Sequence, residues 1–60
     1  MVTIKFETSN ASFGETEDER REETIQTIIS VVDSIRRGKD AGFVVDVNGN
    51  AIGSFKYTNE

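Results

Sequence analysis

Carboxylates are the most concentrated reactive groups in this sequence. Six acidic side chains fall between positions 15 and 23, and only Arg20 and Arg21 offset their charge, so this segment alone carries the net charge of −4. Glu19 and Glu23, four residues apart on a helix, have a spacing that a catalytic pair of carboxylates could use. The exposed start of a helix offers such a pair no apolar pocket. We therefore interpret the segment as a solvated helix start and predict no catalytic residues.

The same acidic segment indicates which partners the protein favours. It repels nucleic-acid phosphates, so direct binding of DNA or RNA is disfavoured, and it attracts a basic protein surface. A row of carboxylates can also imitate a phosphate backbone and occupy the nucleic-acid groove of a partner. We expect four acidic side chains to make these contacts: Glu17, Asp18, Glu22 and Glu23.

The residues that most often ligate metals or act as general bases are missing. The sequence has no His and no Cys, which excludes a disulfide, a thiolate metal site and an imidazole base. Segment 46–50, Asp-Val-Asn-Gly-Asn, is similar to the start of a calcium loop. Ala51 and Tyr57, however, stand where that loop requires Gly and an acid. We predict no metal and no cofactor, and an enzyme is the least expected class.

Basic side chains gather near the end of the expected helix. Arg36, Arg37 and Lys39 are most simply explained as compensation of the helix dipole, and Asp33 can pair with Arg37 at i+4. Together with Lys56, the three cations define one alternative function, weak nucleic-acid binding.

One amphipathic helix must position these groups. Thr16 and Glu19 form a capping-box pattern at its start, and Gly38 provides a left-handed stop at its end. Aliphatic residues in between recur at i, i+3, i+4 and i+7, which predicts a stripe that packs against a sheet. The stripe consists of Ile25, Ile28, Ile29, Val32 and Ile35. We expect the helix over residues 16–37, with its packed part beginning near residue 24.

Three strands are expected to complete the domain. Residues 1–7 alternate between apolar and polar, and segments 42–47 and 51–57 flank Asn-Gly-Asn, a hairpin signal. Phe13, in the first connection, is expected to anchor that loop in the core. We predict a single small α+β domain over residues 1–60, with the order β-α-β-β, one helix packed on a three-stranded sheet and the strand order 1-3-2.

The register of the hairpin has two solutions. A two-residue loop places Val44 and Phe55 on one face of the sheet, whereas a three-residue loop groups Phe55 with Phe43 and leaves Val44 and Ile52 opposite. We favour the three-residue loop, because the helix then covers the aromatic side chains; a bulge at Gly53 could reconcile the two. Since one helix covers one face, Val44 and Ile52 would form an open dimer face, and a homodimeric structural or assembly module is a second alternative function.

Three stretches of the chain follow a pattern found in other small proteins. They are segment 4–8 (Ile-Lys-Phe-Glu-Thr) with Asn10, Ala11 and Phe13, the helix closed by Gly38, and segment 46–55 (Asp-Val-Asn-Gly-Asn-Ala-Ile-Gly-Ser-Phe). In these stretches the chain resembles a widespread group of small phage and prophage proteins with a D-x-N-G-N-x-x-G-x-F hairpin signature. It departs from the group in its longer, highly charged segment 15–24. The resemblance implies a phage or prophage origin and a role inside the host cell, and it supplies no catalytic residues.

The sequence therefore favours a small acidic, non-enzymatic accessory protein. No segment approaches the roughly 20 apolar residues of a membrane span, and the first residues lack the apolar run of a signal peptide. We expect a protein in the host cytoplasm, without a membrane partner. It would bind and modulate a host or anti-phage defence protein, as a nucleic-acid mimic or an anti-CRISPR-type inhibitor does.

Overall fold

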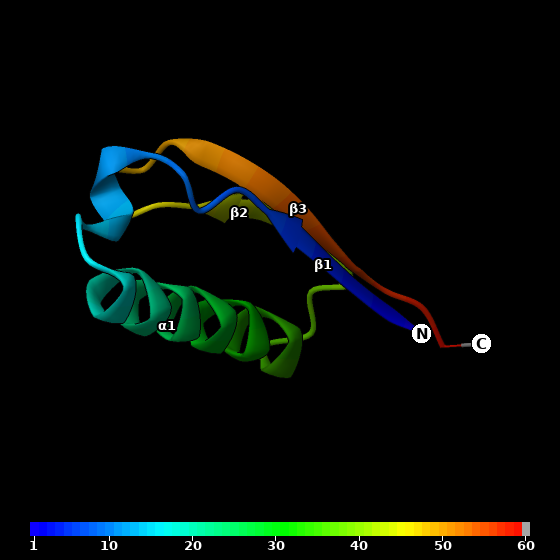
Figure 1. Ribbon diagram of the computed structural model, residues 1–60. Coiled ribbons are helices and arrows are strands. Elements are labelled where there is room, and N and C mark those ends of the chain that lie inside the picture. The colour runs from blue at the N-terminus through cyan, green and yellow to red at the C-terminus, as the bar shows by residue number, and fades with distance from the viewer. Residues whose placement is uncertain (60) are drawn as a thin grey trace.

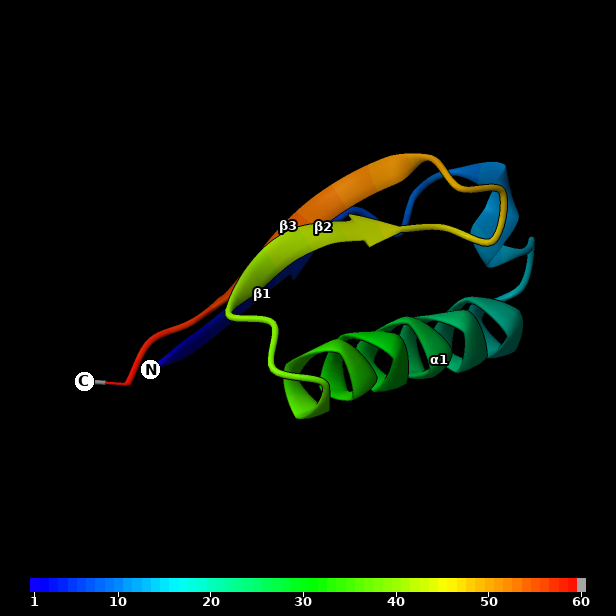
Figure 2. The same ribbon diagram turned by 180° about the vertical axis from the view of Figure 1, so that it is seen from behind.

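The protein is a helix laid along one face of a small sheet. The computed structural model describes residues 1–59. Its elements are strand β1 (Val2–Phe6), the short 3-10 helix η1 (Ala11–Phe13), helix α1 (Glu17–Arg36) and strands β2 (Ala41–Val45) and β3 (Ala51–Tyr57). Figure 1 shows α1 on one side of the curved sheet, and the reverse view in Figure 2 leaves the other face of the sheet without a covering element. The predicted α+β architecture with the order β-α-β-β is confirmed.

The third strand lies at the centre of the sheet. The order is β1-β3-β2, as predicted, and β3 is antiparallel to both neighbours. The start of β1 and the end of β3 therefore lie side by side (Figure 1). The amino group of Met1 donates a hydrogen bond to the Thr58 carbonyl at 2.8 Å, and the Thr58 amide donates to the Met1 carbonyl, also at 2.8 Å.

The register of the hairpin differs from the one that we favoured. Val44 pairs with Gly53 and Gly42 with Phe55, so Val44 and Phe55 share the face that α1 covers. Val44 is 3% exposed, whereas Phe43 on the opposite face is 78% exposed. The expectation that Phe43 shares the covered face with Phe55 was wrong. A bulge follows the Val44–Gly53 pair, because Val45 pairs with Ala51, and this irregularity turns Ile52 toward the core instead of away from it.

Gly53 allows β1 and β3 to approach each other. A Cβ atom at this position would lie 1.9 Å from the Lys5 carbonyl oxygen and 2.5 Å from the Cα of Phe6. Any side chain at residue 53 would therefore push the two strands apart. The glycine beside the bulge is required by this contact and not by an unusual backbone angle.

The core is small and aromatic. Val31, Val44 and Phe55 form its buried centre, and the half-buried Phe6, Ile35 and Ile52 pack around it. Phe13, which is 1% exposed, anchors η1 as predicted, and its ring lies 6.3 Å from that of Phe6 in a stacked arrangement.

Both ends of α1 follow the sequence signals. The side chain of Thr16 accepts a hydrogen bond from the Glu19 amide, and the Glu19 carboxylate accepts one from the Thr16 amide, which completes the predicted capping box. At the other end, the Gly38 amide bonds to the Ile35 carbonyl and the Lys39 amide to the Ser34 carbonyl. Gly38 has a φ of 97°, so the helix ends in a Schellman motif.

The face that α1 turns toward the sheet is not the aliphatic stripe. Thr27 and Val31 are buried, at 6% and 4% exposure, whereas Ile25, Ile28, Ile29 and Val32 are 40–52% exposed. Within the stripe, only Ile35 packs on the core. The expectation that the stripe packs on the sheet was wrong for the other four.

Hydroxyl bonding explains why a threonine takes this place in the core. The Thr27 hydroxyl donates to the Glu23 carbonyl at 2.8 Å, so its polar atom is satisfied within the helix. The Thr27 methyl can then face the core without the cost of an unpaired polar group.

Candidate functional site

A shallow acidic groove lies where the first turns of α1 meet η1. Its volume is about 440 Å³. Its lining consists of Ser12, Phe13 and Gly14 on one side and Asp18, Glu19, Glu22 and Glu23 on the other. The fold thus brings together three of the four acidic residues that we predicted as partner contacts, namely Asp18, Glu22 and Glu23.

The chain reversal at Gly14 places η1 against the helix start. Gly14 has a φ of 87°, and a Cβ atom there would lie 2.7 Å from the Cβ of Glu19. A side chain at residue 14 would be strained in its backbone and would also clash with α1. The groove therefore exists because η1, anchored by Phe13, can lie this close to the acidic turns.

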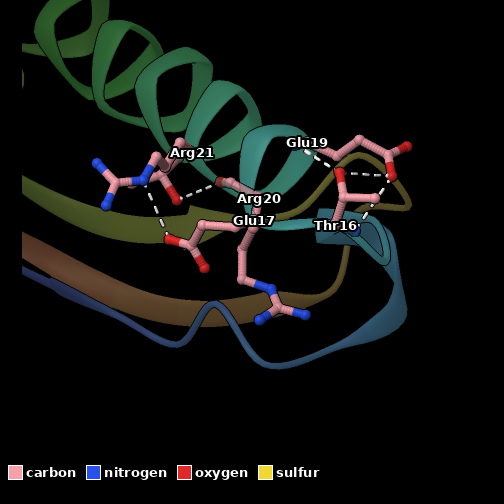
Figure 3. Close-up of polar contacts among 6 residues, drawn as sticks. Thr16, Glu17, Glu19, Arg20 and Arg21 are labelled. Atoms are coloured by element: carbon pink, nitrogen blue, oxygen red, sulfur yellow. Dashed lines mark hydrogen bonds and ion pairs between the residues drawn. The ribbon is translucent and has the colours of Figure 1, made fainter.

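Glu19 has a structural role within the groove. Its carboxylate accepts hydrogen bonds from the Thr16 hydroxyl at 3.0 Å and from the Thr16 amide at 3.2 Å (Figure 3). These bonds, led by that from the side chain of Thr16, lower the pKa of Glu19. Because this carboxylate caps the helix, the other three acidic side chains are the ones available to a partner.

Glu17, the fourth predicted contact, lies outside the groove. Its carboxylate pairs with the Arg21 guanidinium at 3.1 Å, as Figure 3 shows. Both side chains are well exposed, so the pair contributes at most about 1 kcal/mol. Glu17 instead borders a second hollow of about 340 Å³, which Thr8, Arg20 and Ile25 also line. The structure therefore separates Glu17 from the other predicted contacts.

Asp46 organises the other polar cluster of the molecule, a role that we did not predict. It is 8% exposed and lies directly after β2. One carboxylate oxygen accepts the amides of Asn48 and Asn50, both at 2.9 Å. The other accepts the side-chain amide of Asn10 at 3.1 Å and the Ser12 hydroxyl at 3.4 Å. Asp46 therefore shapes the hairpin turn and also joins it to η1.

The hydrogen bonds around Asp46 also set its protonation. The amide of Asn50 makes the largest contribution to lowering the pKa of this carboxyl, and Asn48 and Asn10 add to it, against a smaller opposing effect of burial. The carboxylate therefore stays ionised at neutral pH, and both of its oxygens accept hydrogen bonds from within the protein. Asp46 is a structural residue, and its charge is not free to bind a ligand.

A signal for this cluster was present in the sequence. The Asp-Val-Asn-Gly-Asn segment has the spacing of an Asx turn, in which an aspartate accepts amides two and four residues later. What could not be read from the sequence is that Asn10, 36 residues away, donates to the same carboxylate.

The basic residues do not form a single surface. Arg37 pairs with Asp33 at 3.1 Å, as predicted from their spacing. Lys56 pairs across the sheet with Thr3 and Ala41, and strand alternation points it away from the face that holds Phe55 and α1. Lys56 is therefore separated from the helix cations by the sheet.

The predicted dimer face is also rearranged. Val44 lies under α1 and Ile52 packs on the core, so the expectation that both lie on the open face of the sheet was wrong. The bulge at Ile52 and the actual register are the reasons. The open face instead presents Phe43 and Val45, which alternate with Val44 along β2 and are 78% and 50% exposed.

Charge pairing is the chemistry that the groove offers. Its carboxylates are solvated, and within residues 1–59 no group of three or more Asp or Glu side chains is placed to hold a metal ion. No helix in the described part of the chain is long and apolar enough to span a membrane. Comparison of the chain with protein-family models, with curated proteins and with solved structures gave no match.

Proposed function

We propose that this protein is a small, non-enzymatic accessory protein that binds a basic surface of another protein through the acidic groove. One observation carries the proposal: Asp18, Glu22 and Glu23 line the same groove, beside the exposed edge of η1. Neither ion pair of the described residues involves any of the three. Their charges are thus available to arginine or lysine side chains.

The kind of partner follows from the same charges. A surface that binds nucleic acid is basic, and a cluster of carboxylates competes for it by imitating phosphates. The resemblance of the sequence to small phage proteins adds that such a partner is a host or anti-phage defence protein. The proposed action is inhibition by occupation of the partner's nucleic-acid site.

Removal of the groove charges tests the proposal. Tagged protein would be used to capture partners from a bacterial lysate, beside a variant with Asp18→Asn, Glu22→Gln and Glu23→Gln. Capture should fall about tenfold or more in the variant, and duplex DNA added to the lysate should displace what the wild type captures.

The matched control removes three charges elsewhere, with Glu7→Gln, Asp33→Asn and Asp40→Asn, all at exposed positions. This control should capture partners as the wild type does. Equal capture by the groove variant would exclude the electrostatic mechanism, and equal loss in both variants would show that only the net charge matters.

A further inference from the structure

One lateral side of α1 carries a half-exposed apolar surface. Ile25, Ile28, Ile29 and Val32 are 49%, 40%, 52% and 45% exposed. They occupy adjacent turns of one helix, so their exposed parts adjoin each other along it. Scattered apolar side chains are normal on a protein surface, but a continuous aliphatic row marks an interface.

Charge differs between the two ends of this row. The first turn of α1 holds Glu17, Asp18 and Glu19, and the last turn holds Arg36. Asp18 lies seven residues before Ile25, and Arg36 lies seven residues after Ile29. Because seven residues are about two helical turns, both charges lie on the side of α1 that carries the row. Among residues 1–59, neither takes part in an ion pair. The apolar row is therefore bounded by an unpaired anion at one end and an unpaired cation at the other.

This pattern is complementary to itself. We propose that α1 packs antiparallel against α1 of a second copy of this chain about a two-fold axis, so that the two aliphatic rows meet. Asp18 of each copy then lies near Arg36 of the other, on both sides of the axis. A parallel arrangement would instead place the acidic turns of the two copies side by side, which like-charge repulsion opposes.

The open face of the sheet is a poorer surface for a second copy. Phe43 and Val45 lie there, but Lys5 and Lys56 share this face, since Lys5 pairs with Ser54 and Thr3 with Lys56. Two copies stacked through this face would bring like charges together. The helix face has the further advantage that it enlarges a core with only four buried hydrophobic residues, Phe13, Val31, Val44 and Phe55.

The dimer leaves most of the acidic groove accessible, because only Asp18 of the three groove charges lies at the interface. Glu23 lies two residues before Ile25, which corresponds to about 200° of rotation around the helix. Glu23 and the aliphatic row thus face different directions, whereas Asp18 belongs to both the groove and the interface; the dimer itself does not depend on the proposed function. It would present two acidic grooves to a partner.

Sedimentation equilibrium on the purified protein tests the proposal. The wild type should be dimeric at micromolar concentration, and Ile29→Asp should raise the dissociation constant by about a hundredfold. Circular dichroism should show that the variant remains folded, because Ile29 does not pack on the core. A wild type that stays monomeric up to millimolar concentration would overturn the proposal.

A charge exchange tests the antiparallel arrangement. Asp18→Arg and Arg36→Asp, made singly, should each weaken the dimer about tenfold, and the double variant should regain the affinity of the wild type. Failure of the double variant to recover, with both singles impaired, would contradict the antiparallel pairing. Phe43→Lys on the open face is the control and should leave dimerisation unchanged; loss of the dimer in this variant alone would assign the interface to the sheet.

Discussion

The two faces of α1 differ in a way that the hydrophobicity of their residues does not predict. The face toward the sheet holds Thr27 and Val31, and the face toward solvent holds Ile25, Ile29 and Val32. Most of the isoleucines of the helix are thus outside, whereas a threonine and a valine, together with Ile35, face the core. The sheet supplies the bulk of the core through Phe55, so the helix contributes small side chains that let it approach. Helical periodicity therefore predicts that a helix has an apolar face, but it does not predict that this face packs against the same chain.

Aspartate substitutions at two neighbouring valines, Val31 and Val32, are the strongest test of this difference between the two faces. Val31→Asp would place a carboxylate beside Val44 and Phe55, where it has no partner, at a cost of several kcal/mol. For a domain of this size, that cost approaches the whole free energy of unfolding. We therefore expect Val31→Asp to be unfolded by circular dichroism at 25 °C.

Val32→Asp is the matched control, since it makes the same chemical change one residue further along. Val32 is 45% exposed, so the free energy of unfolding, measured in urea at concentrations where the protein is monomeric, should change by about 1 kcal/mol or less. A Val32→Asp variant as unstable as Val31→Asp would show that the stripe packs inside, as its periodicity suggests.

The same contrast explains how far the sequence could predict the structure. Signals that act within a few residues were read correctly: the capping box of Thr16 and Glu19, the stop at Gly38, and the strands, whose bounds lie within two residues of those expected. The strand order was also predicted, because the hairpin and a single helical crossover leave few arrangements.

Features that depend on strand register or on distant segments were not predicted, although a bulge at the neighbouring Gly53 had been left open as an alternative. The bulge at Ile52 reversed the faces of β2, since a shift of one residue exchanges the two sides of a strand. The bond between Asn10 and Asp46 joins loops that lie far apart in the sequence. In the candidate site, a run of acidic residues was evident, but only the fold shows that Glu17 lies apart from Asp18, Glu22 and Glu23.

The pH dependence of stability distinguishes the buried carboxylate of Asp46 from the exposed carboxylates of α1. Its hydrogen bonds lower the pKa of Asp46 in the folded protein, so protons bind more readily to the unfolded chain. The stabilisation by Asp46 is therefore complete above the ordinary pKa of about 4 and is lost as the pH falls through that value toward the lower pKa of the folded state. Glu19, whose pKa is also lowered, acts in the same direction.

Urea denaturation at a series of pH values measures this effect. Asp46→Asn should be less stable than the wild type at pH 7 and should lose less stability between pH 5 and pH 3. Asp18→Asn, at an exposed position of α1, should instead follow the acid profile of the wild type. An Asp46→Asn variant with an unchanged pH profile would show that other carboxylates govern the acid sensitivity.

The smallest expected effect concerns space that remains on the packed face of α1. A hollow of about 100 Å³ lies between the helix and β2, and Ser34, Val31 and Val44 are among the residues that line it. Ser34→Leu should fill part of this hollow with apolar atoms and raise the free energy of unfolding by about 0.5–2 kcal/mol. Ser34→Ala separates packing from helix propensity, because it removes the hydroxyl without filling space and should gain only about 0.5 kcal/mol. Thermal unfolding of the two variants compares their stabilities. If the leucine variant were no more stable than the alanine variant, the hollow would have no usable space. The small side chains on the packed face of α1 would then already fit closely against the sheet.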